Sequence, residues 1–207
     1  MKKGFNLIFC SVIILAMLTL TACSSASPEK TVKEFCDATK VFDLKTMASK
    51  IDGADDSEEI DLTSLTGEED QLTGLLLDYI KENLSKMTYT VEETKVDGDE
   101  ATVVVNFNYV DSTPLIKSVI TDVFTKSLSS LFSGVEMTDE EMNNTFKASL
   151  EEQRAVVETE LIDKKVEFSC VKKDNKWMIE DLNDDMINVI TSNIYEVAND
   201  MSSMGTE

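Results

Sequence analysis

The alternation of apolar and polar residues in the middle of the chain constrains its fold more than any other feature. Successive side chains of a β-strand point to opposite faces, so such alternation predicts a strand with one buried face. The chain must therefore contain a sheet that packs one face against other apolar groups. The apolar positions of this segment are Ala101, Val103, Val105, Phe107 and Tyr109.

Two further segments fit strands that neighbour this one. Residues 89–91 alternate in the same way. An Asp-Gly pair, which is typical of hairpin turns, lies between them and the strand that contains residues 101–109. Residues 166–170 alternate again, and the polar turn 173–176 then returns the chain to Trp177 and Ile179. These turns predict antiparallel pairing between consecutive strands.

Segments with helical spacing lie before, between and after these strands. A helix is expected from Pro28 behind a Ser27 cap, a short one after Asp43, and another opened by a capping box at Thr66. Two long helices, about 114–132 and 139–162, separate the second strand from the third. A last helix starts at about 184, and the chain after residue 201 is expected to fray.

The order of these elements predicts an α+β fold in which helices cover one face of an antiparallel sheet. The insertion 114–162 is too long for a hairpin connection, and it interrupts the sheet as a helical unit. The alternative is a plain α+β sandwich with segregated helices.

The N-terminal segment has the three parts of a secretory signal. Lys2 and Lys3 give a positive start, residues 7–20 are almost wholly apolar, and small residues follow. The apolar run is shorter than the ~20 residues of a permanent membrane helix. An uncleaved N-terminal anchor is the less favoured alternative.

The sequence Leu20-Thr21-Ala22-Cys23 resembles the lipobox of bacterial lipoproteins. The resemblance implies that 1–22 is a signal peptide and that a diacylglycerol joins the thiol of Cys23. It further implies that 23–27 is a lipidated tether on the extracytoplasmic side of a bacterial cell membrane. Cleavage removes two lysines and no acid, so the mature chain is two charges more negative than the whole chain at −21. Such acidity disfavours nucleic acid as a partner.

Two segments resemble the NTF2-like fold, a curved antiparallel sheet wrapped on helices around a conical pocket. They are "TVKEFCDATKVFDLKTMASKI" and the strand pair "TYTVEETKVDGDEATVVVNFNYV", with "KVEFSCVKKDNKWMIEDL" matching the latter. The group includes small bacterial lipoproteins of unassigned function. The resemblance implies an NTF2-like domain over 28–182 with the helical insertion inside it. A C-terminal helix and frayed tail occupy 183–207.

Few residues suit catalysis or metal binding. The chain has no histidine, which excludes histidine-based triads. Arg154 is its sole arginine, which disfavours bidentate arginine clamps on phosphate or carboxylate. The acidic segments 52–61 and 181–185 do not follow the spacing of a calcium loop. Tyr79, Tyr89 and Tyr109 are present, but no spacing pairs one with an acid as in ketosteroid isomerases. We therefore predict no catalytic residue, metal or cofactor.

Two remaining questions concern burial. Cys36 and Cys170 both fall at inward positions. If their helix and strand pack together, the two thiols can meet and a disulfide between them is possible, but two buried free thiols are the favoured interpretation. The apolar side chains of the helix 114–132 cover more than one narrow stripe of its surface. Burial on two sides within the chain is favoured over a surface that meets a partner or the membrane.

These observations favour a lipid-anchored extracytoplasmic binding module without catalytic activity, whose partner is an unknown small ligand or envelope protein. The alternative is an envelope interaction or structural protein that docks through the insertion. An enzyme of the ketosteroid-isomerase type is least favoured.

Overall fold

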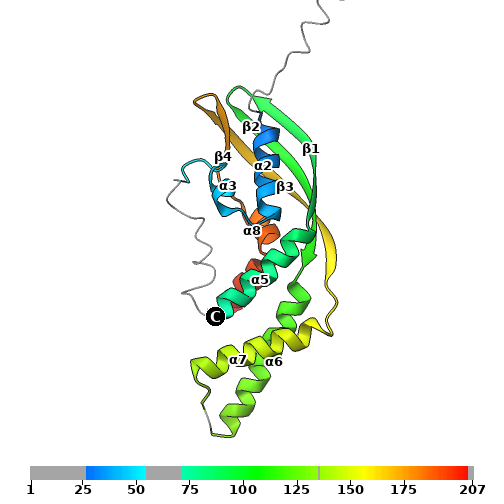
Figure 1. The fold of residues 1–207 in the computed structure, drawn as a ribbon, viewed down its shortest axis with the longest axis vertical. Helices are drawn as coiled ribbons and strands as arrows, with labels where there is room; N and C mark the ends of the chain where they lie inside the picture. Colours follow the sequence, from blue (N-terminus) through cyan, green and yellow to red (C-terminus); the bar gives the residue numbers. More distant parts are fainter. Residues whose placement is uncertain (1–26, 55–70, 135, 205–207) are drawn as a thin grey trace, which may run out of the picture.

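The fold is known from a computed structural model that describes residues 27–54, 71–134 and 136–204. These residues form seven helices and four strands (Figure 1). The helices are α2 (Pro28–Lys40), α3 (Leu44–Ala48), α5 (Gln71–Lys86), α6 (Thr113–Phe132), α7 (Asp139–Arg154), α8 (Asp184–Ile190) and α9 (Ile194–Met204). The strands are β1 (Thr88–Asp97), β2 (Glu100–Asp111), β3 (Glu160–Lys173) and β4 (Lys176–Ile179). The expected signal peptide, the lipobox and the capping box at Thr66 lie outside the described residues.

The four strands form one antiparallel sheet in the order β1-β2-β3-β4, which confirms the predicted α+β class. Val105 of β2 lies opposite Val91 on one side and Val166 on the other. The turn between β3 and β4 holds Asp174 and Asn175 at φ of 49° and 64°, the left-handed values that short hairpin turns need. The sheet curves around α2, which runs across one face of it (Figure 1).

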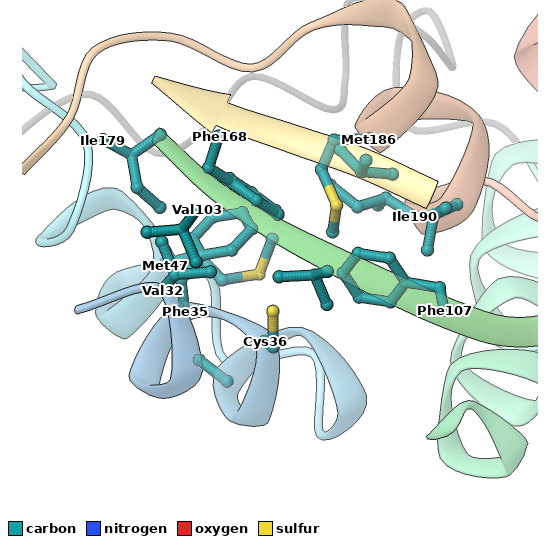
Figure 2. Close-up of a cluster of buried hydrophobic side chains, with 14 of the residues drawn as sticks. Val32, Phe35, Cys36, Met47, Val103, Phe107, Phe168, Ile179, Met186 and Ile190 are labelled. Atoms are coloured by element: carbon teal, nitrogen blue, oxygen red, sulfur yellow. The ribbon is translucent and has the colours of Figure 1, made fainter. Parts of the chain in front are cut away.

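The inward-facing residues of β2 and β3 form the main core together with α2. Val103, Val105 and Phe107 have no exposed surface, as the alternation predicts. Phe35 of α2 meets Phe168 of β3 edge to face, with ring centroids 5.9 Å apart. Met47, Ile179 and Met186 close the cluster from α3, β4 and α8 (Figure 2). The inner face of the sheet is therefore filled by side chains.

The helix expected over 139–162 is too long. Helix α7 ends at Arg154, and β3 already begins at Glu160. Leu161 and Ile162 instead pair with Val110 and Tyr109 in the ladder between β2 and β3. Long-range pairing with β2 therefore decides the structure of this segment, and its apolar residues alone did not reveal that.

The C-terminal helix is broken at residues 191–193 and runs on to Met204 as α9. Ser192 and Asn193 are buried at φ of 53° and 65°. The phenol of Tyr109 donates to Oδ1 of Asn193 at 2.8 Å, and Nδ2 of Asn193 donates to Asp111 at 2.9 Å. These buried bonds offset the cost of left-handed backbone at two residues other than glycine.

Val105 and Val104 offer a matched test of this core because they are neighbours on opposite faces of β2. Val105→Ala is expected to lower the free energy of unfolding by about 2 kcal/mol, since it removes fully buried methyl groups. Val104→Ala is expected to change it by less than about 0.5 kcal/mol. Denaturant titration followed by circular dichroism measures both, and equal losses would contradict the assignment of the inner face.

Candidate functional site

Helices α6 and α7 form a hairpin that projects from the body of the molecule. The hairpin lies at one end of the long axis, and Ser27, where α2 begins, lies at the opposite end (Figure 1). Its base is held by a second small core in which Tyr79 of α5 meets Leu115 and Val119 of α6 and Leu150 of α7. Neither helix contributes a residue to the main core described above.

The apolar side chains of α6 separate into a covered and an uncovered set. Leu115 and Val119 near the base are buried, but Phe124, Leu131 and Phe132 are 61%, 57% and 88% exposed. Burial of this helix on two sides within the chain, the favoured expectation, is therefore wrong for its outer half. The neighbouring helix covers one side of it and leaves the other to solvent.

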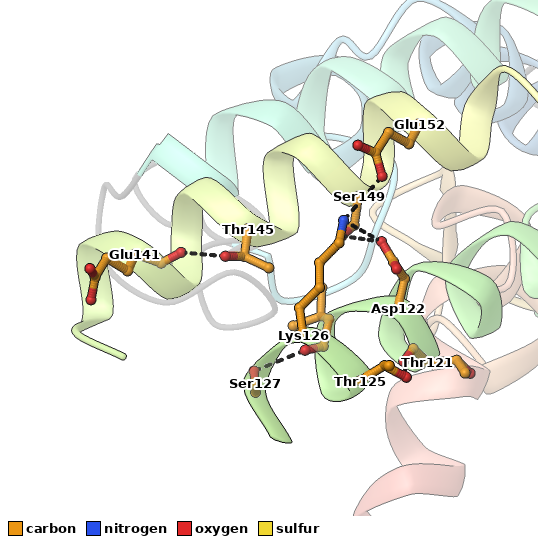
Figure 3. A network of polar contacts seen from close by, with 10 residues as sticks. Thr121, Asp122, Thr125, Lys126, Ser127, Glu141, Thr145, Ser149 and Glu152 are labelled. Carbon is orange, nitrogen blue, oxygen red and sulfur yellow. Dashed lines mark hydrogen bonds and ion pairs between the residues drawn. The ribbon is translucent and has the colours of Figure 1, made fainter. Parts of the chain in front are cut away.

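A polar network around Lys126 locks the two helices together (Figure 3). The ammonium of Lys126 bonds to Asp122 at 2.7 Å on its own helix and to Glu152 at 3.0 Å on α7. Ser149 of α7 donates to the same Asp122 carboxylate at 2.6 Å. The bond from Lys126, followed by that from Ser149, holds the pKa of Asp122 below its usual value, and the two carboxylates raise the pKa of Lys126.

The outer surface of α6 carries hydroxyl groups whose protons are used inside the helix. Thr121, Thr125 and Ser129 each donate to the carbonyl oxygen four residues earlier, at 2.8 to 2.9 Å. This local bonding satisfies the donors without help from solvent. Lys117 is exposed at the start of this surface, and the other two charged residues of α6, Asp122 and Lys126, bond to α7. Around Phe124, the surface therefore carries hydroxyl groups whose donors are already bonded.

The start of α7 is fixed by its own sequence. Thr138 and Glu141 form a complete capping box, as the sequence predicted. The bonds that the Glu141 carboxylate accepts from the backbone and side chain of Thr138 lower its pKa. At the other end of α7, Arg154 bonds to Glu82 of α5 at 2.7 Å and lies over the ring of Tyr79. The hairpin is thus capped at its tip and clamped at its base.

The two cysteines considered for a disulfide lie in the main core. Cys36 and Cys170 are 0% and 1% exposed, and both are free thiols in this structure. Burial raises the pKa of each thiol, that of Cys170 to about 12. The structure confirms that both are inward-facing, and two buried free thiols stay the prediction for the protein in solution. Cys23 lies outside the described residues.

The three tyrosines are each engaged within the fold. Tyr89 donates to Asp37 at 2.7 Å, a tyrosine–acid pair that sequence spacing did not reveal because α2 and β1 are far apart in the chain. Asp37 is exposed at the surface of α2, which differs from a cavity base. The hydroxyl of Tyr79 is 2.9 Å from that of Ser112, and Tyr109 is bonded to Asn193 as described above.

The described residues show no group of three or more acids or cysteines placed to hold a metal ion. Asn183, within the acidic segment 181–185, caps α8, and Asp185 pairs with Lys164 at 2.7 Å. Residues 55–61 of the other acidic segment lie outside the described part of the chain. The clefts found on described residues are open surface depressions, such as one lined by Lys126, Met137 and Glu141 in the hairpin. No described helix has the length and apolar character of a membrane span.

Comparison with known proteins adds little. No protein-family model matches the chain, and no curated protein matches it. The crystal structure of ycdA, a candidate lipoprotein of Bacillus subtilis subsp. subtilis str. 168, is similar at 19% identity with a TM-score of 0.42. The match covers 81% of this chain and 47% of that one, so this chain spans about half its length.

The Lys126 network gives the hairpin a pH dependence. The lowered pKa of Asp122 means that the pair contributes stability above the unfolded pKa of ~3.9 and loses it as pH falls through the lower folded value. Lys126→Met is therefore expected to lower the denaturation midpoint at pH 7, with a smaller difference from wild type near pH 3. Lys95→Met, which removes an exposed pair on β1, is the control. An equal difference at both pH values would contradict the assignment.

The number of free thiols shows directly whether the two core cysteines are bridged. In the mature chain carrying Cys23→Ser, we expect neither thiol to react readily while the protein is folded, because both are buried with raised pKa. Unfolding without reductant is expected to release two thiols, measured with a chromogenic disulfide reagent. A count of zero would instead establish the bridge between Cys36 and Cys170.

Proposed function

We propose that this protein is a non-catalytic interaction module, anchored by lipid on Cys23 outside the cytoplasmic membrane, that binds another protein through its α6–α7 hairpin. The observation that carries this proposal is the exposure of Phe124, Leu131 and Phe132 on a rigid projection. Large exposed apolar side chains gathered in one place are typical of interaction surfaces.

The position of the tether supports the same proposal. Lipidation at Cys23 attaches the chain only a few residues before Ser27, and the hairpin tip lies at the opposite end of the long axis (Figure 1). With the lipid in the membrane, the tip is directed away from it. A partner in the extracytoplasmic space, or in a neighbouring layer of the envelope, is then within its reach.

A small-molecule ligand is less well supported. The fold resemblance implied a conical pocket on the inner face of the sheet, but Val103, Val105 and Phe107 of that face have no exposed surface. Helices α2 and α8, with α3 and α5, fill the space, and the inserted helices take no part in it. Burial of exposed apolar side chains can therefore stabilise a complex at the hairpin surface, whereas those of the inner face are already buried.

The membrane address is tested by Cys23→Ser. We expect the wild-type protein to sediment with membranes and to incorporate a radioactive fatty acid. The Cys23→Ser protein is expected to take up no label and to leave the membrane fraction, because no basic patch or membrane-spanning helix of the described chain would replace the lipid. Equal membrane binding and labelling of both forms would refute the lipoprotein assignment.

The docking surface is tested by photo-crosslinking in intact cells. A photoreactive phenylalanine analogue at Phe124 is expected to give a protein adduct, seen as a band shift on an immunoblot. The same analogue at Val41, which is 74% exposed on the turn after α2, is the matched control. Yields from Phe124 no higher than from Val41 would contradict docking through the hairpin.

A further inference from the structure

The uncovered face of α6 carries a continuous apolar stripe. Ile120, Phe124, Leu128 and Leu131 follow at intervals of four, four and three residues, which places them on one side of a helix. Ile120 and Leu128 are half-buried, and Phe132 extends the stripe to the end of the helix. From their exposed fractions, the two phenylalanines alone present on the order of 300 Å² to solvent.

Negative charge without compensation borders the outer end of this stripe. The chain has no lysine or arginine between Lys126 and Lys147, but it has four acids there, at 136, 139, 140 and 141. Glu136, Asp139 and Glu140 are exposed, and within the described residues no ion pair joins them to a cation. Lys126, the nearest basic residue in sequence, is already bonded to two carboxylates.

We infer that the occupant of this surface is an amphipathic helix of another protein, with lysine or arginine flanking its apolar face. The inference rests on the docking function proposed above and adds the chemistry of the partner. The apolar face of that helix would cover Phe124 and Leu131, as in helix-in-groove recognition. Its cations would lie near Glu136, Asp139 and Glu140, where complementary charge speeds association and fixes orientation.

Charge disfavours the other occupants. A second copy of this chain also has a net charge of −21, and its stripe is bordered by the same acids, so it supplies no complementary cations. A membrane surface with anionic headgroups would repel the tip, and the tip is at the end of the molecule opposite Ser27. A basic amphipathic helix complements both the apolar stripe and the acidic rim formed by Glu136, Asp139 and Glu140.

The Phe124 adduct tests this inference when its crosslinked peptide is identified by mass spectrometry. We expect a segment with apolar residues at helical spacing and an excess of Lys and Arg. An adduct to a second copy of this chain, or to a neutral or acidic segment of another protein, would overturn the inference while leaving protein docking through the hairpin intact. An adduct to lipid would overturn both the inference and the proposed function. The absence of an adduct above the Val41 control would instead remove the proposed function on which the inference rests.

Charge variants give a second test of the inference. Reversal of the rim by Glu136→Lys, Asp139→Lys and Glu140→Lys is expected to lower the yield of the adduct from Phe124 on the order of tenfold. The matched control reverses Asp97, Asp99 and Glu100, which are also exposed, lie at and beside the turn between β1 and β2, and change the net charge by the same amount. Equal losses from both sets would overturn the role of the rim.

A milder variant guards against loss of the fold, because lysines at the start of α7 oppose its helix dipole. Neutralisation by Glu136→Gln, Asp139→Asn and Glu140→Gln keeps the capping box of Thr138 and Glu141. It is expected to give a smaller loss in the same direction, with an unchanged circular dichroism spectrum. An undiminished adduct yield from this folded variant would contradict the inference.

Discussion

The packing of α2 against the inner face of the sheet is the interaction on which the rest of the structure depends. Phe35 of α2 meets Phe168 of β3, and Phe168 in turn lies 6.3 Å from Phe107 of β2. These rings fix the helix across β2 and β3 and exclude water from the space between them. Since apolar burial is the dominant favourable term in folding, this contact determines which face of the sheet is interior.

Because side chains fill the inner face of the sheet, a binding site is expected on the outer surface of the molecule. The resemblance to the NTF2-like fold predicts an open conical pocket, but residues of α2, α3, α5 and α8 pack against the inner face of this sheet. The inserted helices α6 and α7 contribute no residue to the main core. They build a smaller one around Tyr79 and Val119 with the outer side of α5, which covers the base of α6 and leaves its outer half exposed.

The hairpin combines rigidity with an uncovered surface. Lys126 joins the two helices internally. On the solvent-facing side of α6, Lys117 near its start is the charged residue, and the hydroxyl protons of Thr121 and Thr125 are bonded within the helix. In a chain with 29% charged residues, such a face is unusual enough to mark it as a place of contact. Sequence periodicity located this helix, but its exposure depends on where α7 crosses it, which no local pattern encodes.

The sequence by itself determined the strands, their inner face and most helix starts, because alternation and capping are local properties. Ser27, Asp43 and Thr138 all cap helices where expected. Tertiary structure decided what depends on distant partners. Pairing with Val110 turned Leu161 from helix to strand, and the bond from Tyr109 to Asn193 accompanies the break between α8 and α9. The exposure of Phe124 likewise depends on tertiary structure, because it follows from which side of α6 packs against α7.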